Sequence, residues 1–232
     1  MTPDADQRSQ RATNAAPALT VDAPPTMPLR CLNCSNEMRD SIICHSCHTL
    51  REPPASTTHF ELLGFPRQFD ISVHDVRRAF RALARETHPD RFAGGEPETL
   101  ALATRLSAAL NEAAKTLIDP TSRADYLLTL AGGPSATELR DVPGDLLADV
   151  MSIREEIEEA RASGDAEAMR RIRADILERR GAAGNDAAGI ARTLSDADEA
   201  TRRQLRLRLN TIRYFDRLLE SLTEDPLDTR RG

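Results

Sequence analysis

Residues 72–87, followed directly by His88-Pro89-Asp90, constrain the fold of this 232-residue chain more than any other segment. Four apolar residues and a threonine recur there at three- and four-residue steps, the spacing of one face of an α-helix: Val73, Val76, Phe80, Leu83 and Thr87. Arg78, Arg81 and Arg85 fall on the opposite side, and Arg77 lies at its edge. Because Pro89 lacks an N–H and disfavours a helical residue before it, the helix should end near His88. The sequence therefore predicts a basic amphipathic helix that ends in a polar loop.

A second helix is predicted at residues 98–118, where an apolar face is followed by the helix-ending pair Asp119-Pro120. This face would pack against the first helix as an antiparallel pair; it consists of Leu106, Leu110, Ala113 and Leu117. At the start of the first helix, Ser72-x-x-Asp75 resembles a capping box. Together these features predict a helical hairpin.

Three more amphipathic helices are expected after a linker at residues 135–143. They are predicted at 145–162, at 165–180 and from Ser195 onward, where Ser195-x-x-Asp198 resembles a cap. Gly181 to Gly189 is interpreted as a flexible connection. The apolar positions of the first of the three helices, Leu146, Val150, Ile153 and Ile157, would supply its core face. The predicted fold class is therefore all-α, a helical hairpin followed by a three-helix bundle.

All four cysteines fall in two Cys-x-x-Cys pairs near the N-terminus, Cys31/Cys34 and Cys44/Cys47. Two such pairs across a short loop let four thiolates converge tetrahedrally, which favours one structural zinc ion. An iron–sulfur cluster on the same thiolates, a pair of redox motifs, and reduced thiols without a ligand are the alternatives. The neighbouring His45 and His48 could substitute as ligands, but they are interpreted as solvated bystanders because four cysteines already satisfy zinc.

Composition excludes several classes of protein. The net charge of −6 and the 3% content of aromatic residues argue against nucleic acid as a partner. No apolar run approaches the length of a membrane span, so no membrane association is expected. Residues 1–28 have neither periodicity nor a secretory core, and acidic residues among them argue against a transit peptide; we expect a disordered tail. These features favour a bacterial cytoplasm over a mitochondrial matrix.

The motifs together resemble the HscB family, the J-domain co-chaperones of iron–sulfur cluster biogenesis. His-Pro-Asp after a basic helix is similar to a J-domain, and family-like segments follow at 122–128, 153–157 and 212–216. The four-cysteine knuckle resembles that of eukaryotic-type members. The resemblance divides the chain into a tail (1–28), a metal-binding knuckle (29–52), a J-domain (58–133) and a scaffold-binding bundle (143–224).

The resemblance implies a co-chaperone without catalytic residues, acting as a monomer or weak dimer. His88, Pro89 and Asp90 would stimulate the ATPase of a DnaK/HscA-type chaperone, and Arg77, Arg78, Arg81 and Arg85 would dock on it. An IscU-type iron–sulfur scaffold protein would bind Leu147, Met151, Glu155, Glu159 and Tyr214. Cys31, Cys34, Cys44 and Cys47 would hold the metal.

Other interpretations compete with this one. The chain is alternatively a general J-protein for unfolded clients with the knuckle as a client site, or a thiol oxidoreductase that uses its Cys-x-x-Cys pairs. A nucleic-acid-binding zinc ribbon is the least favoured, given the acidic balance. The charged face of the first helix is alternatively ordinary solvated surface, as most charged helix faces are. In that case Pro89 only ends the helix, and His88 and Asp90 are merely exposed.

Overall fold

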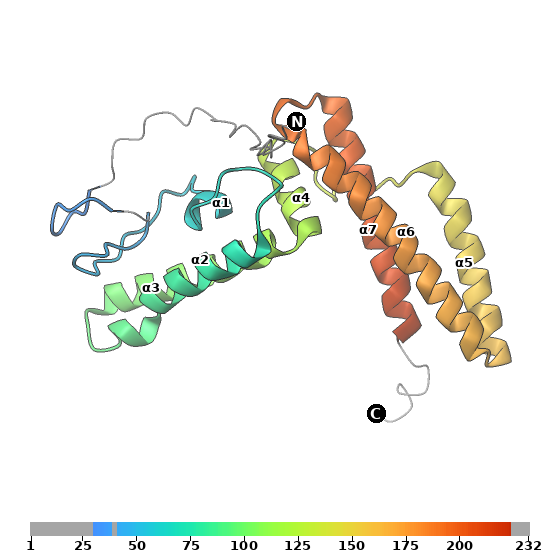
Figure 1. The fold of residues 1–232 in the computed structure, drawn as a ribbon, viewed down its shortest axis with the longest axis horizontal. Helices are drawn as coiled ribbons and strands as arrows, with labels where there is room; N and C mark the ends of the chain where they lie inside the picture. Colours follow the sequence, from blue (N-terminus) through green and yellow to red (C-terminus); the bar gives the residue numbers. More distant parts are fainter. Residues whose placement is uncertain (1–29, 39–40, 224–232) are drawn as a thin grey trace, which may run out of the picture.

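The structure, a computed structural model, describes residues 30–38 and 41–223; the predicted tail at 1–28 lies outside them. The described residues confirm the predicted all-α fold. The helices are α1 (His59–Leu62), α2 (Val73–Glu86), α3 (Pro97–Ile118), α4 (Pro120–Leu130), α5 (Gly144–Ser163), α6 (Ala166–Arg192) and α7 (Glu199–Thr223), with short 3-10 helices η1 (Pro89–Phe92) and η2 (Leu194–Asp196). The α2–α3 hairpin and the α5–α7 bundle extend to opposite sides of α4 (Figure 1). None of the described helices is both long enough and apolar enough to cross a membrane.

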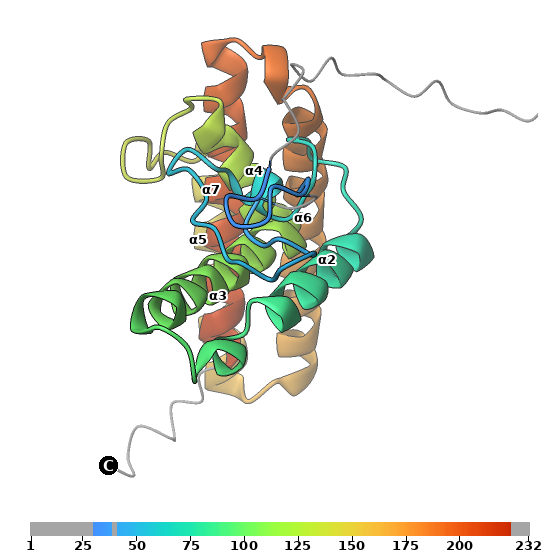
Figure 2. The same cartoon turned by 90° about the vertical axis from the view of Figure 1, so that its left-hand side faces the viewer.

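The hairpin forms as the periodicity predicts. The Ser72 hydroxyl accepts the Asp75 N–H at 3.3 Å at the start of α2. The Asp75 carboxylate pairs with Arg78 at 2.9 Å, so the capping box is only half formed. Val76 and Leu83 of α2 are buried, as is the whole predicted face of α3. Figure 2 shows the two helices side by side in front of the bundle.

One apolar core joins the hairpin to the bundle. Its buried residues include Phe60 of α1 and Leu128 of α4 together with Ala187 of α6 and Leu209 of α7. A second core lies between α5, the first half of α6 and the last turns of α7; it contains the four predicted residues Leu146, Val150, Ile153 and Ile157. Because α6 and α7 contribute to both cores, the hairpin and the bundle are held as one body.

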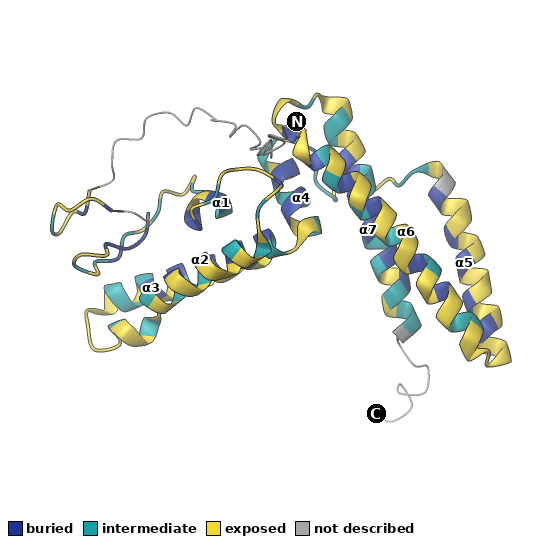
Figure 3. Cartoon of the chain, viewed as in Figure 1, coloured by how far each residue is buried: buried dark blue, intermediate teal, exposed yellow. Residues whose placement is uncertain are grey.

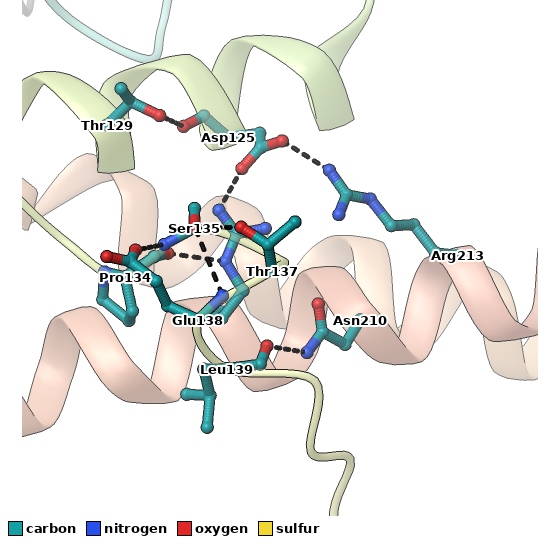
Figure 4. A network of polar contacts seen from close by, with 10 residues as sticks. Asp125, Thr129, Pro134, Ser135, Thr137, Glu138, Leu139, Asn210 and Arg213 are labelled. Atoms are coloured by element: carbon teal, nitrogen blue, oxygen red, sulfur yellow. Dashed lines mark hydrogen bonds and ion pairs between the residues drawn. The ribbon is translucent and has the colours of Figure 1, made fainter.

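A polar network holds the junction between the two parts (Figure 4). Asp125 of α4 binds the guanidinium groups of two α7 residues, Arg206 and Arg213. Asn210 of α7 donates hydrogen bonds of 2.8 Å to the carbonyls of Leu139 and Asp141, on the connection before α5. The connecting segment is therefore fixed along α7 by hydrogen bonds to its backbone.

The expectation of a flexible connection at Gly181–Gly189 is wrong. These residues lie inside α6, which is one continuous helix of 27 residues. Three alanines at four-residue spacing, Ala183, Ala187 and Ala191, are buried against the rest of the core. Burial of this small-residue face stabilises the helix more than the glycines destabilise it, since glycine costs only about 1 kcal/mol in a helix.

The predicted helix start at Ser195 is also wrong. Residues 194–196 form the 3-10 helix η2, and α7 begins at Glu199. The Asp198 carboxylate accepts the Thr201 N–H at 2.8 Å, so Asp198 is the capping residue. The Ser195 hydroxyl instead contacts Asp196 at 3.2 Å. Both Ser and Asp suit the capping position, and the sequence alone does not decide between them.

Candidate metal centre and docking surfaces

The four cysteines converge on one point. Their sulfur atoms all lie within 4.8 Å of one another, with separations of 3.5 Å between Cys31 and Cys47 and 3.6 Å between Cys34 and Cys44. A tetrahedral zinc ion with Zn–S bonds of about 2.3 Å requires sulfur atoms about 3.8 Å apart. The separations are far too long for disulfides, and all four cysteines are free. The donor set therefore fits a four-thiolate metal site.

Two similar turns hold these cysteines. In each, the residue after the second cysteine has a positive φ, 61° at Ser35 and 57° at His48. Its N–H donates to the carbonyl of the first cysteine, at 2.9 Å from Ser35 to Cys31 and 2.7 Å from His48 to Cys44. Each turn thus points both sulfurs of its pair to the same side. Ser35 and His48 thus both hold a backbone conformation that non-glycine residues rarely adopt.

The surroundings of the sulfur atoms act differently on Cys47 and Cys34: they favour the thiolate at Cys47 and oppose it at Cys34. The hydroxyl and backbone of Thr49 lower the pKa of the Cys47 thiol to about 6. At Cys34 the backbone N–H of Asn36 acts in the same direction, but burial and the neighbouring sulfurs outweigh it and raise the pKa to about 12. Crowded thiolates repel each other, and a bound cation compensates that repulsion.

His45 is exposed and stands outside the group of four thiolates, as expected, but it also makes a contact that the sequence did not predict. Its Nδ1 lies 3.1 Å from Oε2 of Glu86, the last residue of α2. The second cysteine turn therefore contacts the end of the basic helix. Sequence reasoning missed this contact because nothing in the spacing of residues so far apart in the chain predicts it.

The His88-Pro89-Asp90 loop begins directly after α2. The Thr87 N–H and hydroxyl both donate to the Leu83 carbonyl, each at 2.9 Å, and end the helix. His88 Nδ1 accepts the Asp90 N–H at 3.3 Å and so caps η1. The side chains of His88 and Asp90 are exposed. The loop is therefore an ordered turn whose polar side chains face solvent.

All four predicted docking arginines of α2 are exposed, so the charged face of the helix is accessible (Figure 3). Arg78 pairs with Asp75. Among the described residues, Arg77, Arg81 and Arg85 have no carboxylate partner. Three guanidinium groups on this face thus carry uncompensated charge, as a surface for an acidic partner requires.

On α5, two large apolar side chains face solvent beside the buried core face. Leu147 is 52% exposed and Met151 is 65% exposed; only Leu32 and Leu177 are comparable among the large apolar residues that the structure describes. Leu147 and Met151 are one helical turn apart, so they form one continuous apolar strip. The strip therefore offers apolar surface that a partner could cover.

The remaining predicted scaffold-binding residues separate around α5. Glu155 and Tyr214 line a groove of about 740 Å³ between α5 and α7. The Arg154 guanidinium lies 5.9 Å from the centre of the Tyr214 ring. Glu159 lies in a different groove, beside α6. Residues four positions apart on a helix are rotated by about 40° around its axis, so Glu159 faces a different neighbouring helix from Glu155. The structure brings Glu155 and Tyr214 together and leaves Glu159 apart from them.

Comparisons with known families cover both helical parts of the chain. Residues 58–126 match the family described as DnaJ domain. Residues 142–223 match the family described as HSCB C-terminal oligomerisation domain.

Individual relatives agree with the family matches. The co-chaperone protein HscB of Proteus mirabilis is 36% identical over 110 residues, covering 47% of this chain and 64% of the relative. The HscB homolog of Bordetella petrii is 41% identical over 46% of this chain and 64% of its own length. That of Chromobacterium violaceum is 38% identical over 50% of this chain and 69% of its own length. The chain thus spans just under two thirds of the length of the first two.

Two solved structures share the fold. The crystal structure of human co-chaperone protein HscB has a TM-score of 0.70 at 24% identity, covering 88% of this chain and 100% of the human chain. Chaperone HscB from Vibrio cholerae has a TM-score of 0.61 at 26% identity, over 72% of this chain and 95% of its own.

Proposed function

Because the chain belongs to the HscB family of J-domain co-chaperones, we propose that it delivers an IscU-type iron–sulfur scaffold protein to a DnaK/HscA-type chaperone and stimulates the ATPase of that chaperone. The chain contributes no catalytic residue in this scheme, since the ATP is bound and hydrolysed by its partner. His88 and Asp90 meet the chaperone, and the α2 arginines set the rate and register of the encounter.

The observation that carries this proposal is the separation of two accessible surfaces on one body. The basic helix and its loop lie at one end of the molecule, and the apolar strip of α5 lies at the other (Figure 1). An adaptor that holds a chaperone and a client at once needs two sites that do not overlap. The two apolar cores share α6 and α7, and this keeps the relative position of the two surfaces fixed.

We assign zinc to the four-cysteine site. The sulfur separations suit its tetrahedral preference, and thiolates are ligands that it favours. Zinc bound there would hold the knuckle folded, because the two turns bury few apolar side chains between them. The site serves stability in this scheme and takes no part in cluster chemistry.

Binding to a purified IscU-type scaffold tests the client half of the proposal. Met151→Lys places a charge in the α5 strip and should weaken binding at least about tenfold, because an apolar side chain loses its burial. Leu177→Lys is the matched control, since Leu177 is 47% exposed on α6, outside the strip. Calorimetry should show full affinity for the control. Unchanged affinity of the Met151 variant contradicts the assignment.

A second candidate function rests on Leu32, which is 94% exposed at the tip of the first cysteine turn. An apolar side chain in that position suits a client site for unfolded polypeptides, as in a general J-protein. Competition distinguishes the two functions. If an unfolded polypeptide binds and Leu32→Ser abolishes that binding, while the scaffold shows no affinity, the general function holds.

A further inference from the structure

The second cysteine turn is built into the J-domain. The side chains of Ile42, Ile43 and Leu50 flank it and are buried in the same core as Phe60 and Val76. The Arg51 N–H donates to the Ile42 carbonyl at 2.8 Å, which closes the base of the turn. Figures 1 and 2 show this segment beside the α2–α3 hairpin. The turn is therefore anchored at its base, and its tip lies against the end of α2.

The tip makes a polar contact at a sensitive place. His45, between Cys44 and Cys47, lies 3.1 Å from Oε2 of Glu86. That oxygen is shielded from solvent and has no hydrogen-bond partner among the described residues, so its polar contact is the close approach of the His45 ring. Glu86 is the last residue of α2 and precedes His88 by two positions. Loss of the His45 contact would remove this favourable approach from a shielded carboxylate oxygen, and Glu86 would have to move toward water.

We infer that His45 and Glu86 are positioning residues for the His88-Pro89-Asp90 loop, through which the second cysteine turn sets the end of α2. This inference rests on the proposed function only for the identity of the partner that meets the loop. His45 holds the Glu86 carboxylate in place. The next residue, Thr87, is also held, because its side chain is buried and its hydroxyl donates to the Leu83 carbonyl. The thiolate site matters here because the four cysteines fix the turn that carries His45.

Backbone amide exchange in the full-length, zinc-loaded protein tests the inference without any partner. The relevant amides are those of Thr87, Asp90 and Arg91, which have hydrogen bonds of 2.9, 3.3 and 3.0 Å. His45→Ala should speed their exchange about fivefold, because the loss of one polar contact lowers the local stability at the end of α2. His45→Gln, whose amide can donate to Glu86, should restore slow exchange.

The matched control is His74→Ala at the other end of α2, where His74 Nδ1 lies 3.5 Å from an Asp75 oxygen. It should leave the three amides unchanged. Removing zinc from the wild type with a chelator under reducing conditions should speed the same amides. Metal analysis must show one zinc in the His45 variants, so that loss of the site is not the cause of their effect.

Unchanged exchange at these amides in His45→Ala with zinc bound overturns the inference. Chaperone stimulation provides the second measurement: His45→Ala should raise the concentration for half-maximal stimulation about threefold and leave the maximum near wild type, as a loosened loop predicts. A normal half-maximal concentration also contradicts the inference. If the zinc-loaded wild type does not stimulate at all, the proposed function fails, and the exchange result still decides the role of His45.

Discussion

Asp125, on α4, forms an ion pair with Arg206, an α7 residue whose side chain is almost completely buried. The Arg206 Nε donates to the Pro134 carbonyl at 2.8 Å, and Arg213 reaches the second Asp125 oxygen at 2.6 Å. One carboxylate therefore neutralises the buried cation that joins the J-domain to the bundle (Figure 4).

Asp125→Ala should destabilise the protein by about 3–5 kcal/mol, because the buried Arg206 guanidinium loses its ion-pair partner. Urea denaturation followed by circular dichroism measures this change. Asp141→Ala is the control, since the Asp141–Arg203 pair is exposed and its atoms are 3.5 Å apart. That change should cost less than about 1 kcal/mol. Equal effects of the two substitutions would contradict the assigned role of Asp125.

Sequence reasoning did not find this network. Arg206 and Asp125 are separated by 81 positions, and the pattern of α7 gives no sign that one of its many arginines points inward. By contrast, the helical hairpin was predictable because Pro89 and the period of α2 and α3 are local signals. The convergence of the four cysteines was predictable from their spacing for the same reason.

Each glycine inside α6 should be replaceable by alanine with a gain in stability. A Cβ added at Gly181, Gly184 or Gly189 meets nothing within 4 Å, and all three residues lie within the helix. Each substitution should add about 0.5–1 kcal/mol to the free energy of unfolding, because alanine loses less backbone entropy.

The opposite result is expected at the C-cap of α5. Gly164 has a φ of 66°, a left-handed conformation that alanine adopts only with strain. Gly164→Ala should lower the free energy of unfolding by about 1 kcal/mol. Thermal melts of the four single variants compare the two cases. A loss of stability on replacing Gly181, Gly184 and Gly189 would show that α6 is interrupted there.

His59 should make stability depend on pH. Its ring stacks on Tyr126 with centroids 4.4 Å apart, and burial lowers its pKa, an effect that Glu112 only partly offsets. The fold therefore favours neutral His59. The resulting stability is complete above the unfolded-state pKa of about 6.5 and is lost as the pH falls from there through the lower folded-state pKa.

Urea denaturation at about pH 7.5 and about pH 5.5 checks this sign. His59→Gln should lose less stability on acidification than the wild type does. His74→Gln, with an exposed histidine, should behave like the wild type. A steeper acid dependence in His59→Gln would contradict the direction of the pKa shift.

The charged face of α2 should control the encounter with a chaperone. Arg81→Glu and Arg85→Glu should each slow association about tenfold at low salt, with a smaller effect at high salt, because screening weakens the attraction. Both side chains are exposed, so the fold should be unaffected. Arg173→Glu applies the same charge change to an exposed site on α6 and should leave the association rate unchanged. Equal slowing by all three variants would indicate net charge rather than a docking face.

The positions of α5 side chains show where sequence reasoning reaches its limit. The period of the helix predicts the buried face that contains Val150 and Ile157, and it leaves Leu147 and Met151 outside that face. The period does not predict which neighbour each acidic residue faces. Glu155 lies beside α7 and Glu159 beside α6 because of how the three helices pack. Those placements depend on long-range contacts and therefore required the structure.

Stimulation of a purified DnaK-class chaperone is the most direct test of the proposed function. Single-turnover ATP hydrolysis is measured with the zinc-loaded wild type and with His88→Gln, whose helical content is checked by circular dichroism. His88 is exposed and caps only η1, so the substitution should preserve the fold. The wild type should accelerate hydrolysis, and the folded His88 variant should not. Full stimulation by His88→Gln, or none by the wild type, would contradict the account.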